Sequence, residues 1–156
     1  MQLKTVLRSI FLLSFANELV NMGLMVWASG QSDNAIGQTA IVTVWAAAGY
    51  LLALILAQKS QPNLSTNIIL ICTALTSILP VFLPELSNGW GVTILLRNAF
   101  GQILYARLST SIPDICTEDM IAEQTKRAQI YGLIGNVSAL VICPWLTEHF
   151  GLPAIL

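Results

Sequence analysis

Long apolar runs, separated by short polar segments, set the pattern of this chain. Residues 34–58, 60–84 and 128–147 contain no Asp, Glu, Lys or Arg. A helix needs about 20 mostly apolar residues to cross a bilayer. The pattern therefore predicts an all-α polytopic membrane protein whose residues 1–156 form a single bundle. The expected spans cover about 5–28, 36–57, 67–83, 92–112 and 128–147, with a sixth span that starts at 151 and is cut short.

The composition supports a membrane protein and excludes several other classes. Hydrophobic residues make up 55% of the chain and charged residues 10%, whereas soluble domains average about 25% charged residues. Seven basic and eight acidic residues provide no basic patch for a nucleic-acid partner. The cysteines, Cys72, Cys116 and Cys143, have no metal-like spacing, and the single histidine is His149. Without a serine–histidine, metal-ligand or phosphate-loop pattern, we expect no enzyme activity, metal or cofactor.

Lysine and arginine positions predict the orientation, because cytoplasmic loops of membrane proteins are enriched in both. With a cytoplasmic N-terminus, the expected outer loops contain no lysine or arginine, and three tryptophans lie at outer span ends. The inner face then holds Lys4, Arg8, Lys59, Arg107, Lys126 and Arg127. This predicts a multi-pass membrane protein whose N-terminus faces the cytoplasm. One alternative stays open, since residues 1–16 also resemble a cleavable signal peptide.

The most charged segment, residues 113–127, lies between the fourth and fifth expected spans. Asp114 and Thr117 are candidate helix caps, acidic residues come early and basic residues come late. This order complements the helix dipole. We expect a short interfacial helix at the cytoplasmic face, either as a solvated connector or as a gate contact.

Two ionisable residues fall inside expected spans, Glu18 in the first and Arg97 in the fourth. Glu18 shares one helical face with Ser14, Asn17 and Asn21, and this polar face must point toward protein or water. An unpaired arginine at mid-bilayer costs roughly 2.5–3.5 kcal/mol on insertion scales. Glu18 and Arg97 are therefore expected to pair or to share a water-filled cavity. The pair serves either proton coupling or ligand binding, or it only fixes the helix register.

Further residues divide into cavity candidates and packing candidates. The expected substrate cavity includes Asn17, Asn21, Gly101, Gln102, Tyr105 and Asn136. Small residues at helical spacing let helices approach closely, which predicts a packing stripe of Gly132, Ala139 and Cys143. Pro144 is expected to bend or end the fifth span. Tyr50 and nearby small residues of the second span are interpreted as a packing face.

The segment "LLRNAFGQILYARLSTSIPDICTEDMIAEQTKRAQIYGLIGNVSALVICPW" resembles the fourth span, cytoplasmic connector and fifth span of major facilitator superfamily transporters. The similarity is strongest to the drug-efflux branch typified by macrolide exporters. Arg97 and Gly101 match the family's arginine and glycine four residues apart. In many proton-coupled members, that arginine acts with a carboxylate of the first span, and Glu18 matches that position.

The chain also departs from the family pattern. The loop after the second span keeps only Lys59 of the usual basic residues. The fifth-span antiporter motif keeps Pro144, with Ala139 and Cys143 as small substitutes for glycine. The family has twelve spans, and alternating access requires two bundles.

The resemblance implies the N-terminal half of a secondary transporter that exports small amphipathic molecules by proton antiport. Glu18 would carry the proton and Arg97 would tune it. The implied partners are the lipid bilayer, a small-molecule substrate, protons and a second six-helix half. We expect that half to be a missing C-terminal half or another copy, and that the chain alone does not transport. The alternatives are a non-transporting accessory protein with a structural Glu18–Arg97 pair, and an uptake transporter half.

Overall fold

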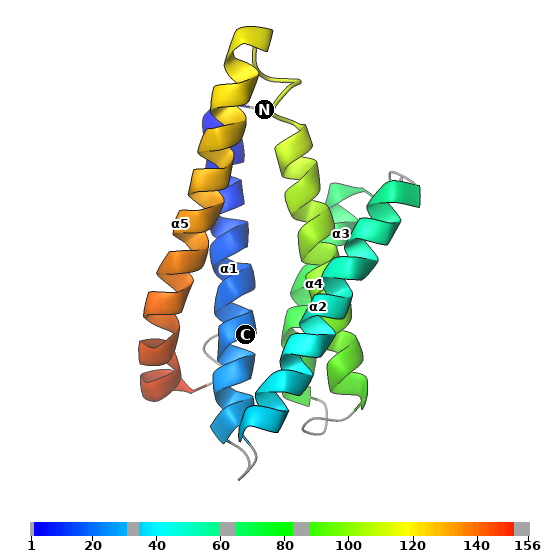
Figure 1. Ribbon diagram of the computed structural model, residues 1–156, viewed down its shortest axis with the longest axis vertical. Coiled ribbons are helices and arrows are strands. Elements are labelled where there is room, and N and C mark those ends of the chain that lie inside the picture. Colours follow the sequence, from blue (N-terminus) through cyan, green and yellow to red (C-terminus); the bar gives the residue numbers. More distant parts are fainter. Residues whose placement is uncertain (1, 31–34, 60–64, 83–87, 152–156) are drawn as a thin grey trace.

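A computed structural model of the chain describes residues 2–30, 35–59, 65–82 and 88–151. These residues form helices and contain no strand. The elements are α1 (Leu3–Gly30), α2 (Ala35–Lys59), α3 (Thr66–Ile78), the 3-10 helix η1 (Leu79–Phe82), α4 (Asn88–Thr110) and α5 (Glu118–Phe150). Successive α-helices alternate in direction, as the colour ramp in Figure 1 shows. The all-α class predicted from the sequence is confirmed.

Three of the described helices contain segments long and apolar enough to cross a membrane. These segments are Leu3–Val26, Thr39–Leu56 and Glu118–Phe150, and Thr66–Ile78 is a shorter apolar helix. In α4, polar residues interrupt the apolar sequence, and Arg97 and Asn98 are buried there. Because α4 contacts α1, α2 and α3, much of its surface faces protein. This position explains why its sequence is less apolar than that of its neighbours.

Helix α5 differs from the sequence-based expectation at both ends. The predicted interfacial helix and fifth span are one continuous helix of 33 residues. Its first turn begins after Thr117, and no breaker separates that turn from the apolar part. Pro144 lies inside the helix, which continues to Phe150. Proline removes only one N–H from the helix ladder, and the rest of the ladder persists. Of the two effects expected of Pro144, a bend or an end of the helix, the end is wrong.

The helices pack as two close groups, α1 with α5 and α4 with α2 and α3. Glycines allow these close approaches. A Cβ added at Gly135 would lie 2.6 Å from the carbonyl oxygen of Phe11, and one at Gly49 would collide with the carbonyl of Leu95. On α5, Gly132, Ala139 and Cys143 all lie on the buried face, and the Cys143 thiol is 3.8 Å from the carbonyl oxygen of Leu19.

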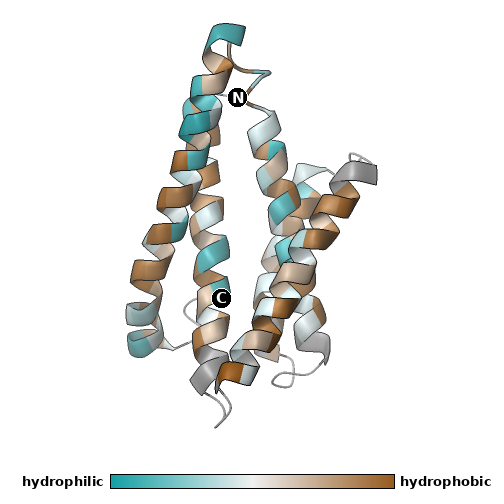
Figure 2. Cartoon of the chain, in the orientation of Figure 1, coloured by the Kyte–Doolittle hydropathy of each residue, from teal (hydrophilic) through white to brown (hydrophobic). Residues whose placement is uncertain are grey.

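The outward faces of the bundle are largely apolar. Large hydrophobic side chains are exposed along α2, α3 and α5, including Val44, Leu70 and Val141. Figure 2 shows apolar positions along the outer helices and hydrophilic positions in the middle of α1 and α4. Polar residues inside and apolar residues outside are compatible with a lipid environment.

Candidate functional site

Arg97 lies in the centre of the bundle and is 1% exposed. Its Nη1 donates to Asn21 Oδ1 at 2.6 Å, and its Nη2 donates to the carbonyl oxygen of Asn17 at 2.7 Å. Its Nε donates to Ser77 Oγ at 3.2 Å. The guanidinium therefore connects α4 to both α1 and α3. These charge-assisted hydrogen bonds compensate part of the cost of burying the charge.

A buried amide pair extends this network. Asn98 is fully buried. The amide nitrogen of Asn21 donates to Asn98 Oδ1 at 3.2 Å, and Asn98 Nδ2 donates to Asn21 Oδ1 at 3.3 Å and to the Ile94 carbonyl at 2.9 Å. Asn21 Oδ1 therefore accepts from both Arg97 and Asn98. We call Asn17, Asn21, Ser77, Arg97 and Asn98 the arginine network.

The direct Glu18–Arg97 pair expected from the sequence does not form. Among the described residues, the one ion pair within 4.0 Å joins Arg127 to Glu123, at 2.6 Å on the exposed surface of α5. The oxygen atoms that accept from Arg97 are neutral. Asn21 lies one helical turn beyond Glu18 on α1, and its amide oxygen takes the position expected for the carboxylate. Glu18 and Arg97 attract each other only at longer range.

Glu18 instead faces a partly open cavity of about 390 Å³ between α1, α2, α4 and α5. Glu18 is half-buried, and it is the only charged side chain among the described residues that line the cavity. The lining is formed by Leu13, Ser14, Asn17, Glu18, Tyr50, Gly101, Gln102, Tyr105, Gln129, Gly132, Leu133 and Asn136. Four helices thus present polar groups around one carboxylate.

Most of the cavity candidates from the sequence line this cavity. They are Asn17, Gly101, Gln102, Tyr105 and Asn136, and Glu18 of the expected charge pair lines it as well. Asn21 and Arg97 do not line it and belong to the arginine network. Gly132, which the sequence places in a packing stripe, contributes both to packing and to the cavity wall.

The sequence-based prediction missed Tyr50 and, on the α5 side of the cavity, Gln129 and Leu133. Tyr50 was interpreted as a packing residue of the second span, but it lines the cavity. Gln129, Gly132, Leu133 and Asn136 follow the spacing i, i+3, i+4 and i+7, which places them on one face of a helix. That spacing is a signal for a polar face in the sequence, and this face overlaps the small-residue stripe on α5.

Two glycines give the polar side chains room. A Cβ at Gly101 would lie 3.0 Å from Asn17 Oδ1, and one at Gly132 would lie 3.3 Å from both Ser14 Oγ and the Tyr105 hydroxyl. Asn17 Oδ1 is buried and has no hydrogen-bond partner among the described residues. This oxygen is enclosed by protein and faces the backbone of α4 at Gly101.

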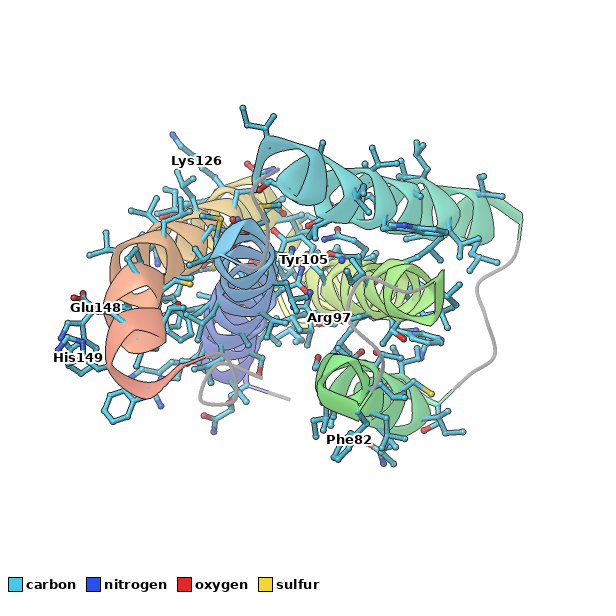
Figure 3. The ribbon with its side chains drawn as sticks, turned by 90° about the horizontal axis from the view of Figure 1, so that it is seen from below. Phe82, Arg97, Tyr105, Lys126, Glu148 and His149 are labelled. Carbon is cyan, nitrogen blue, oxygen red and sulfur yellow. The ribbon has the colours of Figure 1, made fainter. Side chains whose placement is uncertain are left out.

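Figure 3 shows the difference between the interior and the periphery of the bundle. Arg97 and Tyr105 lie between the helices, whereas Lys126, Glu148 and His149 lie along the outside of α5. Arg97 and Tyr105 are eight positions apart on α4, which is roughly 12 Å along the helix, and Asn17 belongs both to the arginine network and to the cavity lining. The arginine network and the cavity are therefore neighbouring levels of one polar interior.

No protein-family profile, curated protein or solved structure matches the chain. The similarity to major facilitator transporters thus stays a prediction from the residues.

Proposed function

We propose that the chain is the N-terminal helical bundle of a secondary, proton-coupled transporter for small molecules. The observation that carries this proposal is the polar cavity between helices whose outward faces are apolar. It contains one carboxylate, Glu18, among the described lining residues. Ionisable residues in a membrane interior commonly belong to proton relays or substrate pathways.

In this proposal, α1 to α5 are five membrane spans of an inner (plasma) membrane protein. Helix α4 crosses the membrane despite its polar residues because three other helices surround it. The bundle end with Lys4, Arg8, Arg107, Lys126 and Arg127 faces the cytoplasm, together with the N-terminus. The opposite end carries Glu148 and His149, which agrees with the enrichment of lysine and arginine on the cytoplasmic side.

The packing pattern supports the transporter proposal independently of the motif. Helix α1 packs closely on α5, and α4 packs closely on α2. If the chain consists of two repeats, α1 of the first repeat corresponds to α4 of the second, and α2 corresponds to α5. The α1–α5 contact then corresponds to the α4–α2 contact. Such a relation is expected of inverted repeats, from which many secondary transporters are built. The second bundle required for alternating access would come from another copy or a further segment.

The separation of Arg97 from Glu18 suggests how coupling works. Arg97 keeps its hydrogen bonds within the arginine network, so Glu18 remains available to the cavity. Glu18 can hold either a proton or a cationic substrate group, and occupancy by one excludes the other. This competition couples proton entry to substrate release, with export as the proposed direction and uptake as the alternative.

The Glu18→Gln variant tests the coupling. In inside-out vesicles from cells that produce the chain together with the second bundle, we expect it to abolish substrate accumulation driven by a pH gradient. The amount of protein in the membrane should not change. Glu123→Gln is the control, because that carboxylate lies on the exposed surface of α5. Unchanged pH-driven transport in Glu18→Gln would overturn the proton role.

A non-transporting accessory protein is the second candidate. The arginine network favours it in one respect, because Arg97 joins three helices without using Glu18. A purely structural role would predict that Glu18→Gln changes neither solute movement nor proton movement. Wild-type membranes would then also lack pH-driven transport.

A further inference from the structure

The lining of the cavity is unusually polar for a small-molecule site. Such sites are mostly lined by hydrophobic and aromatic side chains with a few polar groups. Here the aliphatic side chains that line the cavity are Leu13 and Leu133. The rest of the lining consists of amides, hydroxyls, one carboxylate and glycines. A ligand that offered only apolar surface would leave these polar groups without partners.

Four amide side chains define what the ligand must offer. Asn17, Gln102, Gln129 and Asn136 come from three helices and line the cavity together. Each primary amide is both a donor and an acceptor. A ligand hydroxyl is also a donor and an acceptor, so several hydroxyls could satisfy such a set.

Two protein hydroxyls lie at the boundary between the cavity and α5. A Cβ at Gly132 would be 3.3 Å from both Ser14 Oγ and the Tyr105 hydroxyl, so these oxygens converge on one point of the wall. Tyr50 adds a second phenol from α2. Tyrosine combines an apolar ring with a polar end. A sugar ring matches this combination, because its C–H groups form an apolar face and its hydroxyls project from the edge.

The negative charge of Glu18 in the cavity lining favours a cationic ligand. Glu18 is the charged residue among the described lining residues, and the guanidinium of Arg97 is engaged with Asn21, Asn17 and Ser77. No lysine or arginine lines the cavity in the described part of the chain. An ammonium group on the ligand would supply the missing counter-charge and a charge-assisted hydrogen bond.

We propose that this cavity binds a small polyhydroxylated amine of the amino-sugar type. The proposal rests on the function proposed above and makes the substrate more polar than the amphipathic molecules expected from the sequence. The ammonium binds Glu18, the hydroxyls bind the amides, and the ring lies against a tyrosine. The cavity volume of about 390 Å³ accommodates one or two sugar rings.

Three probes separate the contributions of charge and hydroxyl groups. Binding of glucosamine, glucose and tetraphenylphosphonium to the purified chain in lipid nanodiscs would be measured by isothermal titration calorimetry. Glucosamine has both the ammonium and the hydroxyls, glucose has only the hydroxyls, and tetraphenylphosphonium has only the positive charge. We expect glucosamine to bind at least about 10-fold more tightly than glucose, since a hydrogen bond to a charged group contributes about 1.5–3 kcal/mol. Glucosamine should also bind more tightly than tetraphenylphosphonium.

Two variants assign the selectivity to named groups. Glu18→Gln should remove the preference for glucosamine over glucose, whereas Asn136→Leu should weaken the binding of both sugars by similar factors. Arg127→Ala, on the exposed surface of α5, is the control and should bind as the wild type does. The wild-type probe series is a complete test even if one variant does not fold.

Three results would overturn the proposal. They are absence of saturable glucosamine binding, tighter binding of tetraphenylphosphonium than of glucosamine, and an unchanged glucosamine preference in Glu18→Gln. The measurement uses no pH gradient and no transport. Selective glucosamine binding without pH-driven transport would refute the transporter function alone, and pH-driven transport without this selectivity would refute the substrate class alone.

Discussion

Replacing Asn21 with leucine tests whether the arginine network holds the bundle together. Leucine has a similar shape but provides no acceptor. The substitution would remove the 2.6 Å hydrogen bond from Arg97 and both hydrogen bonds between Asn21 and Asn98. Arg97 is 1% exposed and Asn98 is fully buried. Water therefore cannot easily replace the lost partners without opening the helix contacts.

The expected loss of stability follows from two estimates. A hydrogen bond to a charged group contributes about 1.5–3 kcal/mol in proteins generally. Hydrogen bonds between membrane helices contribute less, about 0.6 kcal/mol on average and about 1.7 kcal/mol at most. Because Asn21→Leu affects a buried charge and a buried amide together, we expect a loss of about 2 kcal/mol, slightly above the membrane maximum for one hydrogen bond and within the range for a charged group.

Equilibrium unfolding of the purified protein in mixed detergent–lipid micelles, followed by far-ultraviolet circular dichroism, would measure this loss. Asn136→Leu is the matched control, because Asn136 is half-buried at the cavity wall and the same atoms are exchanged. We expect the control to lose less than about 0.5 kcal/mol, as is usual away from buried networks. Equal losses in the two variants would refute the structural role of Asn21.

Two further predictions concern packing and orientation. Gly135→Leu should separate α1 from α5 and prevent stable folding, because even a Cβ there would lie 2.6 Å from the Phe11 carbonyl oxygen. The control Gly132→Ala should fold, because the nearest contacts of its Cβ are at 3.3 Å. Size-exclusion chromatography and circular dichroism would compare the two variants. In a cysteine-free background, Lys126→Cys should react with an impermeant maleimide only from the cytoplasmic side and Glu148→Cys only from the outer side. Labelling of both positions from one side would contradict the proposed orientation.

The sequence predicted the helical class well because apolar periodicity is a local property. The expected spans at 5–28 and 36–57 lie within α1 and α2, whose bounds are Leu3–Gly30 and Ala35–Lys59. The start of α5 was predicted less well. Charged residues 118–127 suggested a separate element, but charge on an exposed face does not interrupt helical hydrogen bonding. A charged segment and an apolar segment therefore became one helix.

The sequence predicted most of the residues of the site, but it did not predict which side chains form hydrogen bonds with each other. The polar face of α1 correctly suggested that Asn17 and Glu18 point inward, since such a face is unfavourable toward lipid. The cost of an unpaired charge in the membrane suggested that Glu18 lies near Arg97, but it could not determine which oxygen Arg97 reaches. That choice depends on helix rotation and on Ser77 from α3, which is distant in sequence. Tyr50 was missed as a cavity residue because it shares a helical face with small residues, a pattern that is also typical of helix packing.

The most direct test of the proposed coupling is whether Glu18 itself exchanges a proton. Infrared difference spectra of the protein in lipid membranes, recorded between mildly acidic and mildly alkaline pH, would show the carbonyl band of a protonated carboxyl group. We predict a band in the wild type that is absent from Glu18→Gln and retained in Glu123→Gln. A band that persists unchanged in Glu18→Gln, or a wild-type spectrum without it, would contradict a proton-carrying role for Glu18.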